Sequence, residues 1–432
     1  MDLKPTKPLS GFVELLPAAQ RCFDAAAAKM LHILRTAGFS ILDLPAIERA
    51  EVLTDKDNWD EIETQMFLFQ KGETKMGLRY DGTVGLARYV AGHLNDLAFP
   101  FRAGQFSKRY RGERAQRGRY REFYQMDLDI LGINTLSTNY DAEIIAVIDR
   151  ALGAVREYIG PAVVHIGSRP FWDALFDYLE LTPAQKKEVF VLIDKKDKMS
   201  DEDFFAGLHD ALANVAAENV IRAVFADGYA GVVGKSAALD AAIEELNGFM
   251  QILRLMGVQN AEIDLSITRG LAYYTGLVFE FKLTEHPELG TAAGGGRYAD
   301  LAGKFSKTKI IGVGAAIGFS RIFWALLEGG KIDLSPFEHP ARAAVLVMGN
   351  ENLGYAMEIV RALRGADIVA VPYLDTDKKF KNQIEFANKI GADYSLIVGA
   401  DEVAARAIAV KDMISGVQES VPVDEIVNKL KK

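Results

Sequence analysis

Residues 124–130 alternate strictly between apolar and polar side chains, and this pattern limits the folds open to the chain. Gln125, Asp127 and Asp129 take every second position. The positions between them hold Tyr124, Met126, Leu128 and Ile130. Because successive side chains of a strand point to opposite faces, a period of two predicts a strand with one apolar and one polar face. Strands of this kind belong to antiparallel sheets, which can leave one face uncovered.

Two neighbouring segments carry a similar alternation. The polar side chains on one face of these expected strands are Arg79, Asp81, Thr83, Arg109 and Arg111. For any single strand, a solvent-exposed face explains the pattern at least as well as a ligand site does. Solvent-exposed strand faces are usually rich in lysine, threonine and glutamate, whereas arginine, glutamine and aspartate beside aromatic rings suit recognition of a polar ligand. The combination therefore favours a binding site, and the solvent-exposed face remains the alternative.

Helical and strand patterns give the order of elements in the first part of the chain. Apolar residues at helical spacing predict a helix over residues 18–37, and the apolar run 39–45, which stops at a proline, predicts a strand. Residues 66–132 have the pattern of an antiparallel sheet, and a helix is expected to begin near Asp141. Residues 171–257 are charged and mostly helical, which predicts an insertion between two parts of a sheet domain.

Strand patterns return in residues 264–282, and the glycines at positions 294–296 interrupt them. An apolar segment follows at residues 310–327, and residues 336–340 resemble a linker. After this linker the expected order is strand, helix, strand, helix, strand. Such alternation predicts a small α/β domain of about 90 residues.

The length of 432 residues agrees with more than one domain. The expected fold class is α+β, with an antiparallel sheet domain over residues 1–330, a helical insertion at about 171–257, and an α/β domain over residues 341–432. Hydrophobic residues make up 49% of the chain and charged residues 25%, as in ordinary globular domains. No apolar run reaches the roughly 18 to 20 residues that span a bilayer, so no membrane association is expected.

Composition also bears on compartment and partners. The first eleven residues lack the apolar stretch of a secretory signal, so a cytoplasmic location is expected. Cys22 is the only cysteine, which excludes an internal disulfide and a multi-cysteine zinc site. His93, His165 and His209 show no metal-ligand spacing, so no protein metal site is expected. The net charge of −9 argues against a nucleic-acid partner, but residues 108–121 are dense in arginine and form a local basic segment.

Residues 110–125 predict two strands joined by a loop that carries Gln116, Arg117 and Gly118. An arginine fork can hold a phosphate at two points, and a ring such as Phe123 can lie against a purine. A basic hairpin that binds RNA by charge alone is the alternative, although such a hairpin would not need the glutamine and aspartate positions. The segment resembles motif 2 of the class II aminoacyl-tRNA synthetases, in the form that histidyl enzymes have.

The resemblance extends over nearly the whole chain. Residues 38–45 are similar to motif 1 of the class II enzymes, and residues 312–321 are similar to motif 3. Residues 268–280 resemble the signature that separates histidyl-tRNA synthetases from other class II members. Residues 379–383 resemble part of the anticodon-binding module of this family. The resemblance thus implies a class II antiparallel sheet catalytic domain followed by an anticodon-binding domain.

This family resemblance implies ATP-dependent ligation of L-histidine to tRNA(His) through a histidyl-adenylate. The implied catalytic residues are Arg269 and Arg111. The implied histidine-binding residues are Asp81, Gly82, Thr83, Arg111, Gln125, Asp129, Arg269, Tyr273 and Tyr274. The implied ATP-binding residues are Arg111, Glu113, Phe123 and Arg321. The residues implied to approach the tRNA acceptor end are Gln116 and Arg117.

By the same resemblance, Arg111 would hold the α-phosphate and the carboxylate of histidine, and Arg321 the γ-phosphate. Phe123 would stack on adenine. Asp81 would hold the amino group of histidine, and Asp129 would accept a hydrogen bond from its imidazole ring. Mg²⁺ is expected with ATP, held largely by phosphates and water. Motif 1 implies a homodimer.

Two alternatives remain beside this hypothesis. One is a non-catalytic paralogue, such as the regulatory subunit of ATP phosphoribosyltransferase, which typically lacks the C-terminal module and has a degraded signature around Arg269. This sequence has both the C-terminal module and the signature. The other is a class II synthetase for proline, threonine or glycine, against which residues 268–280 argue. Ala272 and Ser320 depart from the commonest bacterial pattern, which has acidic residues at these positions.

Overall fold

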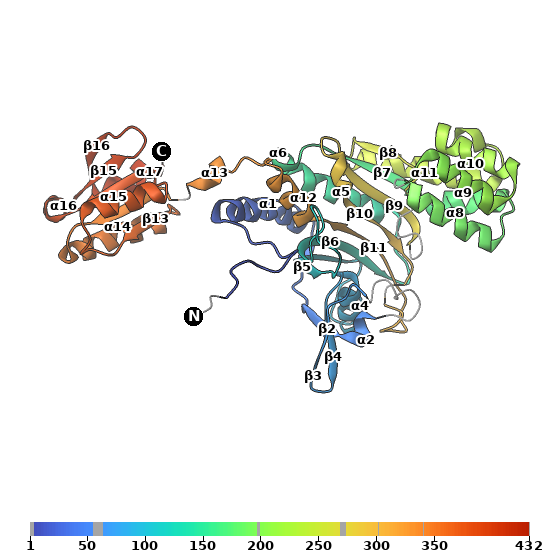
Figure 1. Cartoon of the computed structure of the whole chain (residues 1–432), viewed down its shortest axis with the longest axis horizontal. Coiled ribbons are helices and arrows are strands. Elements are labelled where there is room, and N and C mark those ends of the chain that lie inside the picture. The colour runs from blue at the N-terminus through green and yellow to red at the C-terminus, as the bar shows by residue number, and fades with distance from the viewer. Residues whose placement is uncertain are drawn as a thin grey trace. The chain divides into compact units, whose positions relative to one another are not determined.

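A computed structural model describes residues 4–54, 64–196, 199–267, 274–300, 302–339 and 341–431 (Figure 1). The chain divides into two compact units. One comprises residues 1–14 and 25–332, and the other comprises residues 15–24 and 333–432. Among the described residues, none of the helices combines the length and the apolar composition that a membrane span requires.

An eight-stranded sheet forms the centre of the first unit, in the order β1-β5-β6-β11-β10-β9-β7-β8. In this order its strands are β1 (Ser40–Ile41), β5 (Phe101–Tyr110), β6 (Glu122–Ile133), β11 (Ile310–Ile317), β10 (Thr291–Tyr298), β9 (Tyr274–Leu283), β7 (Ala162–Ser168) and β8 (Ala261–Ile263). The strands from β5 to β7 pair antiparallel, and β1 and β8 pair in parallel at the two edges. The predicted α+β fold with an antiparallel sheet is therefore confirmed.

Helices cover both faces of this sheet. α5 (Asn139–Gly153) packs on β6, β7, β10 and β11, and α12 (Phe319–Glu328) packs on β6. The apolar positions Met126, Leu128 and Ile130 of β6 are completely buried. α4 (Thr83–Gly92) contributes to a core cluster that includes Leu131 of β6. By strand alternation Leu131 shares a face with Gln125, Asp127 and Asp129, so α4 lies on the polar face.

The predicted helical stretch consists, in the described residues, of α7 (Arg169–Tyr178), α8 (Pro183–Lys195), α9 (Asp201–Leu212), α10 (Val215–Asp227) and α11 (Ala237–Leu255). In each of the helices α8 to α11, the side chain of the N-cap residue accepts a hydrogen bond from a backbone N–H of the first turn. These N-caps are Thr182, Ser200, Asn214 and Ser236. Because such caps satisfy N–H groups that have no partner within the helix, they fix where each helix starts.

Shorter elements complete the first unit. A three-stranded sheet has the order β2-β4-β3, with β2 (Ile47–Arg49), β4 (Thr74–Leu78) and β3 (Leu68–Lys71). The short helices are α2 (Ala50–Leu53), α6 (Arg156–Ile159) and the 3-10 turns Gly228–Val232 and Pro287–Leu289. The predicted helix at residues 18–37 is α1 (Pro17–Thr36).

Three predictions of local structure were wrong. The strand expected at residues 39–45 is only Ser40–Ile41, because β1 pairs with β5 over two residues and the chain then leaves for the small sheet. Residues 66–132 are not all strand. The strand expected at residues 78–83 ends at Leu78, and α4 begins at Thr83, so Arg79, Asp81 and Thr83 do not share a strand face. Within α4, Leu86, Ala87 and Val90 are buried at helical spacing. In these two cases the local pattern predicted a strand, but packing against other parts of the chain ended the strand early or favoured a helix.

The third wrong prediction concerns the glycines at positions 294–296. They do not interrupt the sheet but lie inside β10. A Cβ on Gly295 would lie 2.1 Å from the carbonyl oxygen of Gly314, and a Cβ on Gly296 would lie 2.9 Å from the ring of Tyr274. These glycines therefore permit close approach of neighbouring groups rather than a turn.

The second unit contains a five-stranded sheet in the order β13-β12-β14-β15-β16. Its strands are β12 (Ala343–Val347), β13 (Ala370–Tyr373), β14 (Tyr394–Val398), β15 (Ala407–Asp412) and β16 (Gln418–Pro422). Its helices are α13 (Ser335–Glu338), α14 (Leu353–Gly365), α15 (Phe380–Lys389), α16 (Ala400–Ala405), α17 (Ile426–Lys431) and the 3-10 turns Asn350–Asn352 and Val423–Glu425. β12 pairs in parallel with β13 and β14, as expected for alternating strands and helices.

Candidate active site

A cavity of about 700 Å³ lies between the loop that joins β5 to β6 and the start of α12. Its volume is in the range usual for small-molecule sites. Six of the residues predicted to bind ligands line this cavity: Arg111, Glu113, Gln116, Phe123, Gln125 and Arg321. The first unit therefore brings together, in one concave site, residues that lie more than 200 positions apart in the sequence.

Arg111 stands at the wall of the cavity between two aromatic rings. Its guanidinium carbon lies 4.6 Å from the centroid of the Tyr80 ring and 5.2 Å from that of Phe123. Its Nε donates to the carbonyl oxygen of Tyr80 at 3.4 Å. The two rings hold the planar guanidinium by cation–π contact, which leaves a fixed cationic fork of the kind that binds phosphate or carboxylate.

A tight turn closes one side of the cavity. The backbones of Gln116 and Arg119 exchange hydrogen bonds of 3.1 and 2.8 Å, and Gly118 has a φ of +76°, which favours glycine. Gln116 lines the cavity. The side chain of Arg117 instead donates to the carbonyl oxygen of Ala325 in α12 at 3.0 Å. Of the two residues expected near a tRNA acceptor end, the structure thus places Gln116 at the cavity and Arg117 against α12.

Arg321 reaches the cavity from the first turn of α12, where its Nη2 donates to the carbonyl oxygen of Leu289 at 2.8 Å. The preceding residue, Ser320, is completely buried. Its Oγ accepts from the N–H of Tyr124 at 2.5 Å and lies 3.2 Å from the carbonyl oxygen of the same residue. Ser320 therefore joins the start of α12 to β6 and fixes the helix turn that carries Arg321.

Residues 81–83 form the turn that begins α4. The carboxylate of Asp81 accepts the N–H groups of Thr83 at 3.0 Å and Val84 at 3.1 Å. Burial raises the pKa of Asp81, against the opposing effects of the Val84 hydrogen bond and the Arg109 charge. Asp81 and Thr83 are thereby held in one rigid turn over the polar face of the sheet.

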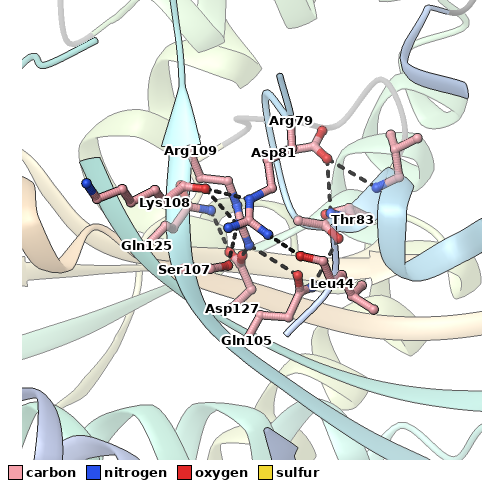
Figure 2. Close-up of polar contacts among 12 residues, drawn as sticks. Leu44, Arg79, Asp81, Thr83, Gln105, Ser107, Lys108, Arg109, Gln125 and Asp127 are labelled. Carbon is pink, nitrogen blue, oxygen red and sulfur yellow. Dashed lines mark hydrogen bonds and ion pairs between the residues drawn. The ribbon is translucent and has the colours of Figure 1, made fainter. Parts of the chain in front are cut away.

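Beneath this turn lies a buried ionic cluster, made of Gln105, Arg109 and Asp127 (Figure 2). Arg109 is completely buried, and its Nη2 forms an ion pair with Asp127 and donates to Gln105 at 3.3 Å. Gln105 in turn donates to the carbonyl oxygen of Gly82 at 3.0 Å. Ser107 accepts from Arg109 at 2.7 Å. The alternative of a solvent-exposed polar face was therefore wrong for β6, because this cluster and the turn cover it.

A second buried carboxylate, Asp129, lies on the same face of β6. Its Oδ1 accepts a hydrogen bond of 2.8 Å from the hydroxyl of Tyr298 in β10. Burial raises the pKa of Asp129 to about 7, although the Tyr298 hydrogen bond opposes the rise. Tyr298 pairs with Tyr274 across β10 and β9, so Asp129 and Tyr274 lie next to the same phenol. A carboxylate poised near neutrality among phenols can accept an N–H from an uncharged or charged ring.

Two of the predicted residues, Arg269 and Tyr273, lie outside the described residues, as does Ala272. Sequence reasoning also missed residues that the site contains. Arg109 and Asp127 were seen as polar strand positions but given no role, and Tyr298 was not singled out as a site residue. The signal for Asp127 was present, since it shares a strand face with Gln125 and Asp129.

Comparisons with known proteins show which family this chain resembles. The family model described as histidyl-tRNA synthetase matches residues 11–322, and the model described as anticodon binding domain matches residues 342–432. The histidine--tRNA ligase of Stenotrophomonas maltophilia is 35% identical, with 99% of this chain and 98% of that protein covered. The histidine--tRNA ligase of Clostridium acetobutylicum is also 35% identical, with 97% and 98% covered.

Solved structures give the same result. The crystal structure of histidyl-tRNA synthetase from Nostoc sp. matches with a TM-score of 0.86 at 30% identity and covers 99% of both chains. A Bacillus halodurans structure titled ATP phosphoribosyltransferase regulatory subunit/histidyl-tRNA synthetase matches with a TM-score of 0.71 at 21% identity, over 89% of this chain and 97% of that one. At that identity it supports the fold alone. The chain belongs to the histidyl-tRNA synthetase family.

Proposed function

We propose that this chain ligates L-histidine to tRNA(His), using ATP and passing through a histidyl-adenylate. The observation that carries the proposal is the placement of Arg111 and Arg321 at one cavity that Gln125 also lines. Arg111 bonds the carbonyl oxygen of Tyr80, the residue that precedes the turn of residues 81–83. Joining a carboxylate to the α-phosphate of ATP brings two anions together, which requires fixed positive charge at the reacting groups. The family membership supplies the identity of the amino acid and of the RNA.

Each side chain has a proposed task. Arg111, fixed between two rings, holds the α-phosphate and the carboxylate of histidine as the new bond forms. Arg321 holds the γ-phosphate, and Phe123 stacks on adenine. Asp129 accepts from an imidazole N–H, which selects histidine over apolar rings of similar size. Arg269 is the second catalytic cation, a role that rests on the sequence signature.

The amino group of histidine is proposed to bind at the turn of residues 81–83 together with Gln125. Asp81 and Gln125 offer oxygen acceptors, which an ammonium group requires because it has only donors. Tyr273 and Tyr274 are proposed to border the imidazole ring, and Gln116 to approach the acceptor end of tRNA. Arg117 is proposed to act there from its position against α12.

Mg²⁺ is proposed to enter with ATP. Among the described residues that line the cavity, Glu113 is the one with a carboxylate side chain. Mg²⁺ commonly combines one or two carboxylates with phosphate oxygens and water, so Glu113 fits a site that ATP completes. The ion would neutralise phosphate charge, while Arg111 and Arg321 orient the phosphates.

The remaining family expectations are proposals as well. Residues 1–330 form the catalytic domain and residues 341–432 bind the anticodon, in a homodimer located in the cytoplasm. The helical insertion clamps the acceptor stem of tRNA, so its deletion should weaken aminoacylation more than adenylate formation. Equal loss of both steps would remove the idea of a clamp.

The decisive experiment is exchange of labelled pyrophosphate into ATP, measured with each of the common amino acids. We expect exchange with histidine alone, reduced by about 10²-fold or more in Arg111→Ala and Arg269→Ala. The control is Arg150→Ala, because Arg150 is an exposed residue near the end of α5 and should leave exchange unchanged. A folded wild-type protein that supports exchange with no amino acid would instead be a regulatory paralogue.

A further inference from the structure

The turn of residues 81–83 rests directly on a buried ion pair, and glycine at position 82 makes this possible. Gly82 has φ −95° and ψ −18°, a conformation that any residue can adopt. A Cβ at this position would nevertheless lie 2.4 Å from Nη2 of Arg109 and 2.4 Å from Oδ2 of Asp127. Since Arg109 is completely buried, its guanidinium has little room to move aside. Glycine is therefore required here for contact rather than for backbone freedom.

The same cluster binds the turn through its backbone. Gln105 donates from Nε2 to the carbonyl oxygen of Gly82 at 3.0 Å, and its Oε1 accepts from Arg109 at 3.3 Å. Gln105 is thus oriented from one side by the arginine, which can only donate. The turn, Gln105 and the ion pair are consequently one connected unit, visible in Figure 2.

Asp127 also fixes the amide of Gln125. Gln125 donates from Nε2 to Oδ1 of Asp127, while Oδ2 of Asp127 pairs with Arg109. A carboxylate accepts and cannot donate, so the amide must present its NH₂ group to Asp127. The carbonyl oxygen of the Gln125 side chain then points away from the Asp127 carboxylate. Because Gln125 lines the cavity, this oxygen is available there as an acceptor. Asp127 therefore makes Gln125 an acceptor toward the cavity, which suits a cation.

We propose that Arg109 and Asp127, with Gln105, are positioning residues that set the acceptors for the α-ammonium group of the amino-acid substrate. They do so by supporting the Asp81 turn through Gly82 and by fixing the carbonyl oxygen of Gln125. This proposal rests on the proposed function, because it concerns how the same site binds histidine. It assigns to the buried ion pair a role in substrate affinity, since a buried pair adds little stability over apolar residues of similar size.

The test separates ammonium recognition from general folding. Histidinol retains the ammonium group and imidazolepropionate lacks it, so each is titrated calorimetrically against wild type and Asp127→Asn. The side-chain amide of asparagine can rotate so that its NH₂ group faces Gln125. The amide of Gln125 is then free to rotate as well and to present its NH₂ group, rather than its carbonyl oxygen, to the cavity. We expect the affinity for histidinol to fall by at least about tenfold and the affinity for imidazolepropionate to stay unchanged. Equal affinities of wild type and variant for histidinol would overturn the proposal.

Kinetics provides a second readout. In pyrophosphate exchange, Gly82→Ala should raise KM for histidine by at least about tenfold and leave KM for ATP unchanged. Gly85→Ala is the matched control, because a Cβ there would meet Glu48 at 3.7 Å and Leu44 at 4.0 Å, which are ordinary contacts. Equal rises of both KM values, or no rise in either, would contradict a positioning role.

Removal of one charge alone can prevent folding, because it leaves the other buried without its partner. The double variant Arg109→Met/Asp127→Leu removes both charges at once and keeps apolar volume in their place. We expect this protein to fold and to show the raised KM for histidine with an unchanged KM for ATP. A folded double variant with wild-type KM for histidine would refute the inference. Absence of histidine-dependent exchange in the wild type would instead refute the proposed function.

Discussion

The hydroxyl of Tyr298 lies 2.8 Å from Oδ1 of Asp129, across three strands of the central sheet. β11 separates the strands that carry these two residues, and its glycines leave the space between them. A Cβ on Gly312 would lie 2.4 Å from the Tyr298 ring, and a Cβ on Gly314 would lie 2.1 Å from Oδ1 of Asp129. The hydrogen bond between Tyr298 and Asp129 therefore requires glycine at positions 312 and 314 of β11.

The first prediction concerns the pH dependence of stability. Burial raises the pKa of Asp129 to about 7, so protonation of this group favours the folded state. Its contribution to stability is full below the ordinary pKa of 3.8 and is lost as the pH rises through about 7. Between pH 5.5 and 8 the loss amounts to about 2 kcal/mol, because the slope of about 1.36 kcal/mol per pH unit levels off around pH 7.

Asp129→Asn removes this titration. Urea unfolding of wild type and variant should therefore show a difference in unfolding free energy that shifts by about 2 kcal/mol in favour of the variant from pH 5.5 to pH 8. The control is Glu188→Gln, because Glu188 is exposed. The difference in unfolding free energy between wild type and this variant should not change with pH. A pH-independent difference for Asp129→Asn would contradict the raised pKa.

The second prediction is that Tyr298→Phe weakens histidine binding most at neutral pH. The Tyr298 hydrogen bond lowers the pKa of Asp129, so its loss leaves less carboxylate at pH 7. KM for histidine in pyrophosphate exchange should rise about tenfold at pH 7, and the effect should shrink at pH 8.5. Tyr178→Phe, at a partly exposed position on α7, is the control. A uniform rise across pH would indicate lost packing instead.

The third prediction concerns Gly314 of β11, the strand between β6 and β10. Gly314→Ala should destabilise the protein by about 1–3 kcal/mol, because Gly314 pairs directly with Asp129 and its Cβ would overlap that carboxylate. Gly248→Ala in α11 is the opposite case, since a Cβ there meets nothing within 4 Å among the described residues. We expect it to stabilise by about 0.5–1 kcal/mol. Urea denaturation of both variants checks the two signs, and a stabilising Gly314→Ala would be incompatible with the packing described.

The fourth prediction concerns Ser320. Its hydroxyl bonds the backbone of Tyr124 inside the core, so Ser320→Ala should cost about 1–3 kcal/mol of unfolding free energy. The same change loosens the helix turn that carries Arg321, so KM for ATP should rise more than KM for histidine. Ser335→Ala, at an exposed position, should stay within about 0.5 kcal/mol of wild type. An unchanged KM for ATP would show that Ser320 acts on stability alone.

Local patterns were sufficient for much of the fold. The helix α1, the helical insertion and the first three strands of the second unit follow patterns that a short segment carries by itself. The last two strands of that unit, β15 and β16, were not predicted. The glycines of β10 were misinterpreted as an interruption, because the neighbours that require them, Gly314 and Tyr274, are distant in the sequence or on another strand. A pattern within one segment cannot reveal which backbone passes close by.

The sequence by itself determined that residues 125, 127 and 129 share one strand face, and family motifs identified the cavity residues Arg111 and Arg321. Tertiary structure alone decided that this face is buried beneath the turn of residues 81–83, and that Arg109 fills the space under Gly82. The physical reason is that alternation is set by the backbone of each strand, whereas burial and charge pairing depend on which remote segment packs over it.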